Sequence, residues 1–257
     1  MTDPFRNPLK KKLSQGCPCI GAWLTSGAAI TAEAMATLGF DWLCVDMEHG
    51  SSDISQVEAV FMAVERHGVA PMVRIGTMNG DLARRLLDLG AVGIIVAAVE
   101  DAEAFEDFAR YCLYAPAGYR GVGLSRCNRW GDDFEDYKDN FSPLMVPMVE
   151  TRRGVDAAVQ LAALPMVDAL FIGPYDLSSD LSCGGDFQAP VFTSAVESVR
   201  MACGGTNKAL GIHQVKPDVG ELQGRIDDGF TLLAYGTDVI AMRHALSSVR
   251  DIKGTKK

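Results

Sequence analysis

Residues 70–97, with the sequence APMVRIGTMNGDLARRLLDLGAVGIIVA, contain one complete strand–helix–strand unit. The runs Ala70–Ile75 and Val92–Ala97 are almost continuously apolar, which is typical of parallel strands buried on both faces. Between them Asn79–Leu89 has the pattern of an amphipathic helix, and Gly90 follows as a helix stop. This stretch predicts two parallel strands joined by a helix.

The same unit recurs along the chain. The predicted strands are Cys19–Leu24, Asp41–Asp46, Ala70–Ile75, Val92–Ala97, Leu144–Val149, Asp168–Ile172, Ala209–His213 and Thr231–Tyr235. The predicted helices are Ile30–Leu38, Asp53–His67, Asn79–Leu89, Asp101–Leu113, Arg152–Leu164, Pro190–Cys203, Pro217–Asp228 and Asp238–Val249. Eight such units predict that residues 1–257 form a single domain of the α/β class, a (β/α)8 TIM barrel. The alternative is an open doubly wound sheet, but residues 24–27, LTSG, are not the glycine-rich turn of a dinucleotide-binding fold.

Two segments fall outside the repeating unit. The connection at about 114–143 is much longer than an ordinary barrel loop, and such loops are usually lids or interface elements. Lys253–Lys257 is expected to be a short polar tail. The polar residues Met1–Pro4 do not resemble a signal peptide, and the longest apolar run, Ala91–Val99, is far too short to span a membrane.

Charge and cysteine content narrow the possible partners. The formal net charge of −9 makes nucleic acid an unsuitable partner and means that an anionic substrate needs a local cation or metal. The one basic run, Lys10-Lys11-Lys12, is expected to be solvated surface. The chain has seven cysteines and no CxxC pair, so free thiols in a reducing cytoplasm are expected.

Polar residues follow several predicted strands at their carboxyl ends, where TIM barrels place their active sites. The second strand leads into Asp46-Met47-Glu48-His49, so His49 is either a general base held by a carboxylate or a surface-loop histidine. Arg74 near the end of the third strand suits a carboxylate or a developing enolate oxygen; a structural salt bridge is the alternative. His213 at the end of the seventh strand is a secondary candidate.

Two acids end neighbouring strands, Glu150 after the fifth and Asp176 after the sixth. Two carboxylates in one barrel mouth repel each other unless a cation lies between them. Oxygen ligands favour a hard divalent ion such as Mg²⁺ or Mn²⁺. The alternative is that each acid pairs with an arginine or caps the next helix.

Several segments of the chain, taken in order, resemble the HpcH/HpaI aldolases. The matching segments are Gly39–Trp42, Asp46–Gly50, Val73-Arg74, Leu87–Ala91, Tyr114–Gly123, Val149–Thr151, Phe171–Ser178 and Gly236–Asp238. Each motif is weak alone, but the ordered set covers nearly the whole chain and is specific.

The resemblance implies a role for each residue. Glu150 and Asp176 would hold a divalent metal ion, Mg²⁺, Mn²⁺ or Co²⁺. His49 would be the acid/base of the reaction, helped by Asp46 and Asp88.

It also implies how the substrate binds. Arg74 would contact the keto oxygen of pyruvate, and backbone amides near Gly173, Pro174 and Tyr175 would face its carboxylate. The family assembles as homo-oligomers, usually hexamers, with sites near subunit interfaces.

The implied activity is that of a class II pyruvate aldolase, a carbon–carbon lyase that cleaves a 4-hydroxy-2-oxo acid to pyruvate and an aldehyde. A Schiff-base aldolase needs a lysine in the barrel, but the sixth strand has none, and Lys208 precedes the seventh strand at the wrong end. A citrate-lyase-β-like enzyme acting on a CoA thioester and a non-catalytic barrel that binds an oxo acid are further alternatives.

The chain departs from the family at a few positions near the expected pocket. Tyr175 stands where members often have a small residue, Met148 where many have glutamine, and Asp180–Ser182 where Ser-Leu-Gly is common. Val96–Ala98 replaces a common Val-Pro. These changes put the identity of the aldehyde in question.

Overall fold

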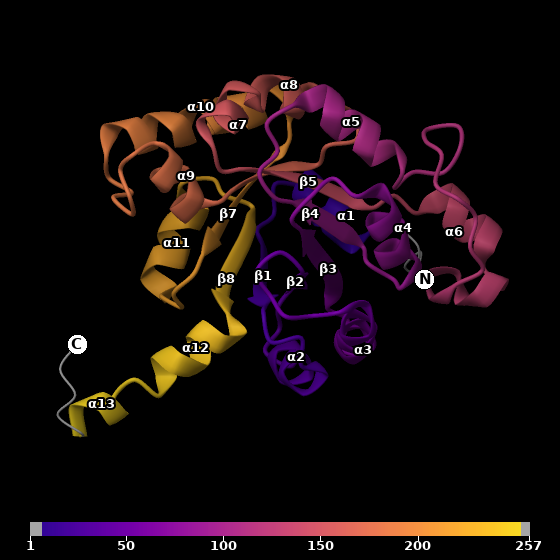
Figure 1. Cartoon of the computed structure of the whole chain (residues 1–257), viewed down its shortest axis with the longest axis horizontal. Helices are drawn as coiled ribbons and strands as arrows, with labels where there is room; N and C mark the ends of the chain where they lie inside the picture. Colours follow the sequence, from indigo (N-terminus) through magenta and orange to yellow (C-terminus); the bar gives the residue numbers. More distant parts are fainter. Residues whose placement is uncertain (1–6, 253–257) are drawn as a thin grey trace.

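Eight parallel strands close into a barrel in the computed structural model, which describes residues 7–252 (Figure 1). Each strand pairs with the next in sequence order, and β8 closes the barrel on β1. The strands are β1 Cys19–Leu24, β2 Trp42–Asp46, β3 Ala70–Ile75, β4 Gly93–Val96, β5 Leu144–Val149, β6 Ala169–Ile172, β7 Ala209–Gln214 and β8 Leu232–Thr237. The predicted (β/α)8 fold is confirmed.

The strands are lined by two apolar cores, one inside the barrel and one between barrel and helices. Along β3, Ala70 and Met72 belong to the inner core, whereas Val73 and Ile75 belong to the outer one. This alternation arises because successive side chains of a strand point to opposite faces. It also explains why every predicted strand is an almost continuous apolar run.

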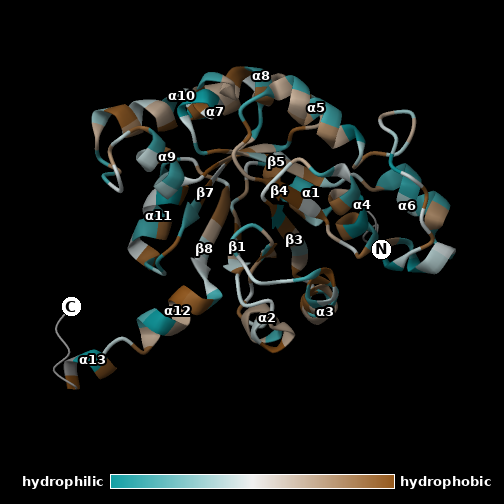
Figure 2. Cartoon of the chain, in the orientation of Figure 1, coloured by the Kyte–Doolittle hydropathy of each residue, from teal (hydrophilic) through white to brown (hydrophobic). Residues whose placement is uncertain are grey.

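Helices form the outer layer, and Figure 2 shows hydrophilic and hydrophobic residues alternating along them. They are α2 Ala29–Ala36, α3 Ile54–Glu65, α4 Gly80–Asp88, α5 Ala102–Arg110, α7 Arg152–Asp156, α8 Ala158–Ala163, α10 Pro190–Thr206, α11 Val219–Asp227 and α12 Asp238–Ala245. Asp53 caps α3 in a capping box with Gln56, as its type and position predict. The helix expected at 152–164 is divided in two at Ala157.

One short helix that the sequence did not predict, α1 Pro8–Ser14, closes the amino-terminal end of the barrel. Leu9 is 1% exposed and packs into the inner core. Lys10 lies 3.1 Å from Asp168, and Lys12 lies 2.5 Å from Asp41. The expectation of a solvated lysine run holds for Lys11, which is exposed, and for Lys12, whose side chain is 43% exposed in its ion pair, but not for Lys10, whose side chain is 27% exposed.

The long connection after α5 contains two further helices, η1 Arg126–Gly131 and α6 Phe134–Asn140. Its most buried cation is Arg120, which donates to Asp88 at 2.6 Å and lies 4.7 Å from the ring centre of Tyr114. A buried guanidinium is costly unless it is paired, so this cluster fixes the connection against α4.

The chain ends in an arm. Helices α12 and α13, Val249–Ile252, extend away from the barrel in Figure 1. Helix α12 contacts the neighbouring strands β1 and β8, and its first residue, Asp238, accepts hydrogen bonds from Thr25 and Ser26 after β1. The predicted tail at 253–257 lies outside the described residues. Within residues 7–252, no helix is both long and apolar enough to cross a membrane.

Candidate active site

Three charged side chains reach the carboxyl end of the barrel because of strand alternation. In β2, Trp42 and Cys44 face the inner core, so Asp46 also points inward. By the same period of two, Arg74 follows the inward residues of β3, and Glu150 follows those of β5. All three are buried, with 2% of Asp46, 8% of Arg74 and 5% of Glu150 exposed.

Arg74 is held by two carboxylates. Its Nε and Nη2 donate to Asp46 at 2.9 and 2.5 Å, and its Nη1 lies 3.1 Å from Glu48. The guanidinium also lies 4.8 Å from the ring centre of Trp23. A guanidinium has five N–H groups, so each Nη keeps a hydrogen for a further acceptor.

Asp46 is ionised in this network. Burial alone would raise its pKa, but hydrogen bonds and charge attraction from Arg74 and bonds from the amides of Glu48 and His49 outweigh burial and lower it. Those amides donate at 3.0 and 3.2 Å, so Asp46 fixes both Arg74 and the backbone that carries His49.

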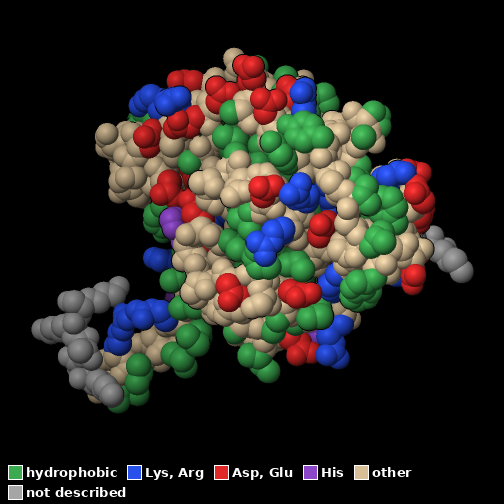
Figure 3. All heavy atoms as spheres, turned by 45° about the vertical axis from the view of Figure 1, so that its right-hand side comes forward, with side chains coloured by type: hydrophobic (Ala, Val, Ile, Leu, Met, Phe, Trp, Pro, Cys, Tyr) green, Lys and Arg blue, Asp and Glu red, His purple; other side chains and the backbone are tan. Residues whose placement is uncertain are grey.

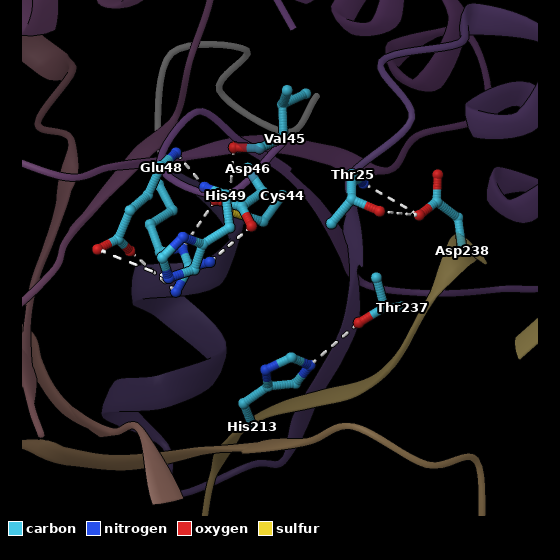
Figure 4. A network of polar contacts seen from close by, with 10 residues as sticks. Thr25, Cys44, Val45, Asp46, Glu48, His49, His213, Thr237 and Asp238 are labelled. Atoms are coloured by element: carbon cyan, nitrogen blue, oxygen red, sulfur yellow. Dashed lines mark hydrogen bonds and ion pairs between the residues drawn. The ribbon is translucent and has the colours of Figure 1, made fainter. Parts of the chain in front are cut away.

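His49 lies at the open edge of this group. Its side chain is 65% exposed, and Nε2 is 4.0 Å from Oε1 of Glu48 (Figure 4). The contact is too long for a hydrogen bond. The ring is therefore free to meet a substrate that enters the mouth.

Glu150 has one satisfied oxygen and one orphaned one. Oε1 accepts from the Ala98 amide at 2.6 Å, whereas Oε2 is buried and has no hydrogen-bond partner among residues 7–252. Ala98 adopts a left-handed backbone, φ 47°, which is costly for a residue with a Cβ. Burial raises the pKa of Glu150 to about 7, and the charges of Asp176 and Glu48 act in the same direction.

The space around the orphaned oxygen depends on a glycine. An added Cβ at Gly173 would lie 2.3 Å from Oε2 of Glu150, so any larger residue there would displace the carboxylate. Asp176 is exposed in the first turn of α9, Pro174–Asp180, three residues further on. A buried oxygen without a partner, beside a second acid, is the environment that a cation completes.

These residues fit a hard divalent ion. Among residues 7–252 there is no group of three or more histidine, cysteine or acidic side chains arranged for a metal. A pair of carboxylates nevertheless suits Mg²⁺, which is commonly held by one or two carboxylates and keeps its other positions for water and substrate.

Of the backbone amides predicted to face a substrate carboxylate, one is free to donate. Pro174 has no N–H, and the amide of Gly173 donates to the Val149 carbonyl at 3.4 Å. Of the three residues expected to face a substrate carboxylate, only Tyr175 therefore retains a free amide, in the first turn of α9.

Asp88 does not join this group within the chain. It lies at the carboxyl end of α4, and barrel helices return the chain to the amino-terminal end of the strands. Its carboxylate pairs with Arg120 at 2.6 Å. The help that the resemblance implies from Asp88 to His49 is thus not visible within residues 7–252, because the helix carries Asp88 away from the mouth.

Further site residues were not recognised from the sequence. Glu48 contacts Arg74 and faces His49, and its place inside the strand-end motif was a signal for this. Trp23 faces inward from β1 and lies between Arg74 and His213, whose ring centre is 5.2 Å from that of Trp23. The hydrogen bond from the Ala98 amide to Glu150 depends on the left-handed backbone at Ala98, which the residue type does not indicate.

Fold and site together define a class: a TIM-barrel protein with an acidic pair, an arginine and a histidine at the mouth. The model of the HpcH/HpaI aldolase/citrate lyase family matches residues 19–245. The chain belongs to this family.

Individual relatives align with this chain over nearly their whole length. A hydroxypyruvate/pyruvate aldolase of Chromohalobacter salexigens is 34% identical over 97% of this chain and 98% of its own. A 4-hydroxy-2-oxo-heptane-1,7-dioate aldolase of Klebsiella pneumoniae is 34% identical over 93% of this chain and 94% of its own. The crystal structure of a family protein from Burkholderia cenocepacia superimposes with a TM-score of 0.85 at 32% identity, covering 95% of this chain and 99% of that one.

Proposed function

We propose that this chain is a class II pyruvate aldolase, a lyase that reversibly cleaves a 4-hydroxy-2-oxo acid to pyruvate and an aldehyde with the help of a divalent ion. The observation that carries the proposal is the orphaned, buried Oε2 of Glu150 beside Asp176, at the mouth of a barrel of this family. Similar proteins named as aldolases of this chemistry support it.

In this proposal, Glu150 and Asp176 hold Mg²⁺, Mn²⁺ or Co²⁺, and the ion supplies Lewis acidity at the 2-oxo acid. Arg74 keeps hydrogens on its Nη atoms and donates to the 2-oxo oxygen as negative charge develops there. Asp46 holds Arg74 in place, and the free amide of Tyr175 faces the carboxylate of the substrate.

His49 takes the proton of the 4-hydroxyl group. The C3–C4 bond then breaks, the aldehyde carbonyl forms at C4, and the electron pair passes to C3. A proton returned to C3 gives the methyl group of pyruvate. Glu48 lies beside His49, with its Oε1 4.0 Å from Nε2 of the ring.

The test is release of pyruvate from a panel of 4-hydroxy-2-oxo acids by the EDTA-treated protein, with and without added Mg²⁺, Mn²⁺ or Co²⁺. We expect release only with metal, and no covalent adduct after borohydride treatment in the presence of pyruvate. A pyruvyl-lysine adduct would instead assign Schiff-base chemistry, although β6, Ala-Leu-Phe-Ile, offers no lysine.

Two alternatives predict other outcomes of the same panel. A CoA-thioester lyase would release nothing from the free acids but would release product once a CoA thioester is added to the panel, and it needs a basic surface for CoA. On the face seen in Figure 3, acidic and basic side chains are interspersed. A barrel that only binds an oxo acid would release nothing. No nucleic acid or membrane enters the proposal.

We further propose that the protein assembles as a homo-oligomer, a hexamer by family resemblance, in a reducing cytoplasm. The projecting arm supports assembly, because Met242 and Leu246 on it are 56% and 64% exposed. Apolar side chains on an isolated arm are typical of a surface that another chain covers. All seven cysteines are free thiols, which supports the compartment.

A further inference from the structure

The two acids proposed to hold the metal lie on segments that separate where the sheet ends. Glu150 follows β5 and leads into α7, whereas Asp176 lies in α9 after β6. The two strands pair as far as Val149 and Ile172, and beyond that point the chain continues into the two helices. The separation of the two carboxylates therefore depends on how α7 and α9 are held together.

A single hydrogen bond joins the two helices among residues 7–252. The Oδ2 atom of Asp180, the last residue of α9, accepts from the amide of Arg152, the first residue of α7, at 2.7 Å. Amides in the first turn of a helix have no partner within the helix, so a carboxylate is a suitable acceptor for this one. Arg152 lies two residues after Glu150, and the bond therefore restrains the segment that carries Glu150.

Helix α9 connects Asp180 rigidly to Asp176. The two acids are four residues apart and so lie on one face of the helix, a turn from each other. Between them, Ser178 is fully buried. Its hydroxyl donates to the Tyr175 carbonyl at 2.9 Å and accepts from the Gly185 amide at 3.0 Å. A displacement at Asp180 is therefore passed on to Asp176.

The start of α9 also leaves little freedom next to Glu150. A Cβ at Gly173 would lie 2.3 Å from Oε2 and 3.0 Å from Cβ of Glu150, so the helix approaches this side chain closely. The charge of Asp176 disfavours that of Glu150, and the two acids repel each other until a cation binds. A bond between α7 and α9 opposes this repulsion and keeps the pair close enough to share one ion.

We propose that Asp180 is a positioning residue of the metal site, which holds the Arg152 amide and thereby keeps Glu150 and Asp176 at the separation that one divalent ion needs. The inference rests on the proposed function, which assigns these two acids to the metal. Asp180 acts through the backbone and is not itself a ligand. Groups that hold metal ligands in place typically change metal affinity by about 10- to 100-fold when they are removed.

The experiment measures the Kd of Mn²⁺ by calorimetry, and it removes each partner of the hydrogen bond in turn. Asp180→Ala removes the acceptor. Arg152→Pro removes the donor at a position that tolerates proline, because it is the first of a helix and Thr151 before it is extended, with φ −136° and ψ 162°. We expect each variant to raise Kd about tenfold or more, and the double variant to bind no more weakly than either one alone.

Two matched variants separate the hydrogen bond from other effects. Arg152→Ala removes the same side chain as Arg152→Pro but keeps the amide, and Asp180→Asn removes the charge of Asp180 but keeps an oxygen that accepts from that amide. We expect both to bind Mn²⁺ with nearly the wild-type Kd. Asp180 is exposed, so its replacement should leave the free energy of unfolding nearly unchanged, which denaturant unfolding checks.

Wild-type affinity in Asp180→Ala or in Arg152→Pro would overturn the inference. An Asp180→Asn variant that binds as weakly as Asp180→Ala would also overturn it, because the lost charge alone would then explain the effect. In these cases metal-dependent pyruvate release by the wild type would leave the proposed function standing. A wild type that binds no Mn²⁺ would overturn the proposed metal site and this inference together.

Discussion

The carboxyl group of Glu150 is buried and accepts a hydrogen bond from the strained backbone of Ala98. Its protonation makes the metal affinity of the site depend on pH. Its pKa of about 7 lies above the ordinary value for glutamate because burial and neighbouring acids disfavour the charge. Below about pH 7 the metal-free side chain therefore holds a proton, which must leave before a cation binds. We expect the apparent affinity for Mn²⁺ to fall by up to about tenfold per pH unit below pH 7 and to level off above it.

Calorimetric titration of Mn²⁺ between pH 5.5 and 8.5 measures this dependence. In Glu150→Gln the amide cannot titrate, so the break near pH 7 should disappear along with most of the affinity. A wild-type affinity that stays constant over that range would remove Glu150 from the metal site.

His49 tests the acid–base assignment. We predict that His49→Ala lowers kcat by about a hundredfold or more, the usual scale for a positioned general acid or base. Metal affinity should remain that of wild type, because the ring does not contact Glu150 or Asp176 in this structure. His67→Ala, two residues after the end of α3, is the matched control, and its turnover should be unaffected. A folded His49→Ala enzyme with normal turnover would exclude the assignment.

Among the residues themselves, the sequence and the structure agree on which side chains gather at the mouth of the barrel, whereas their roles stay a prediction. A strand end in a buried parallel sheet is enough to place Asp46, Arg74 and Glu150 at one mouth. It did not reveal that Asp88 pairs with Arg120, because that contact depends on how the long connection folds back. It also did not reveal that the left-handed Ala98 presents its amide to Glu150.

Among the elements, α1 has a role that its composition conceals. Three lysines in seven residues look like solvated surface, and the helix is too short for a periodic pattern to be recognised. Yet Leu9 fills the amino-terminal end of the inner core. The helix is stabilised by packing against the end of the barrel, and the local sequence does not specify that tertiary contact.

We predict that Leu9→Ala destabilises the fold by about 2–5 kcal/mol, the range for removing a fully buried leucine. Denaturant unfolding measures the change, and Lys11→Ala on the exposed side of the same helix should alter stability by less than about 0.5 kcal/mol. Equal effects of the two substitutions would show that α1 is not part of the core.

The strands and barrel helices were predicted to within a few residues because glycines, capping acids and apolar runs mark their ends. The segment at 114–143 was recognised only as too long. Its helices η1 and α6 depend on Arg120 and on aromatic packing with Tyr137 and Tyr114, contacts that local sequence does not specify.

For the whole molecule, the arm formed by α12 and α13 carries the proposed assembly. If another copy of the chain covers it, placing charges there should weaken association. We predict that Met242→Asp combined with Leu246→Asp shifts the protein to smaller species in sedimentation velocity, whereas Val159→Asp, at an exposed site on α8, does not. A wild-type protein that is monomeric at micromolar concentration would contradict the proposal.

The central claim is that Glu150 and Asp176 hold the ion on which pyruvate formation depends. The most direct measurement is the rate of pyruvate release against Mg²⁺ or Mn²⁺ concentration after EDTA treatment. It compares wild type, Glu150→Gln and the exposed control Glu103→Gln. We predict no release in EDTA, full recovery with metal for wild type and control, and a requirement for at least about tenfold more metal in Glu150→Gln. Full activity in EDTA, or a Glu150→Gln enzyme with the wild-type metal dependence, would contradict the account.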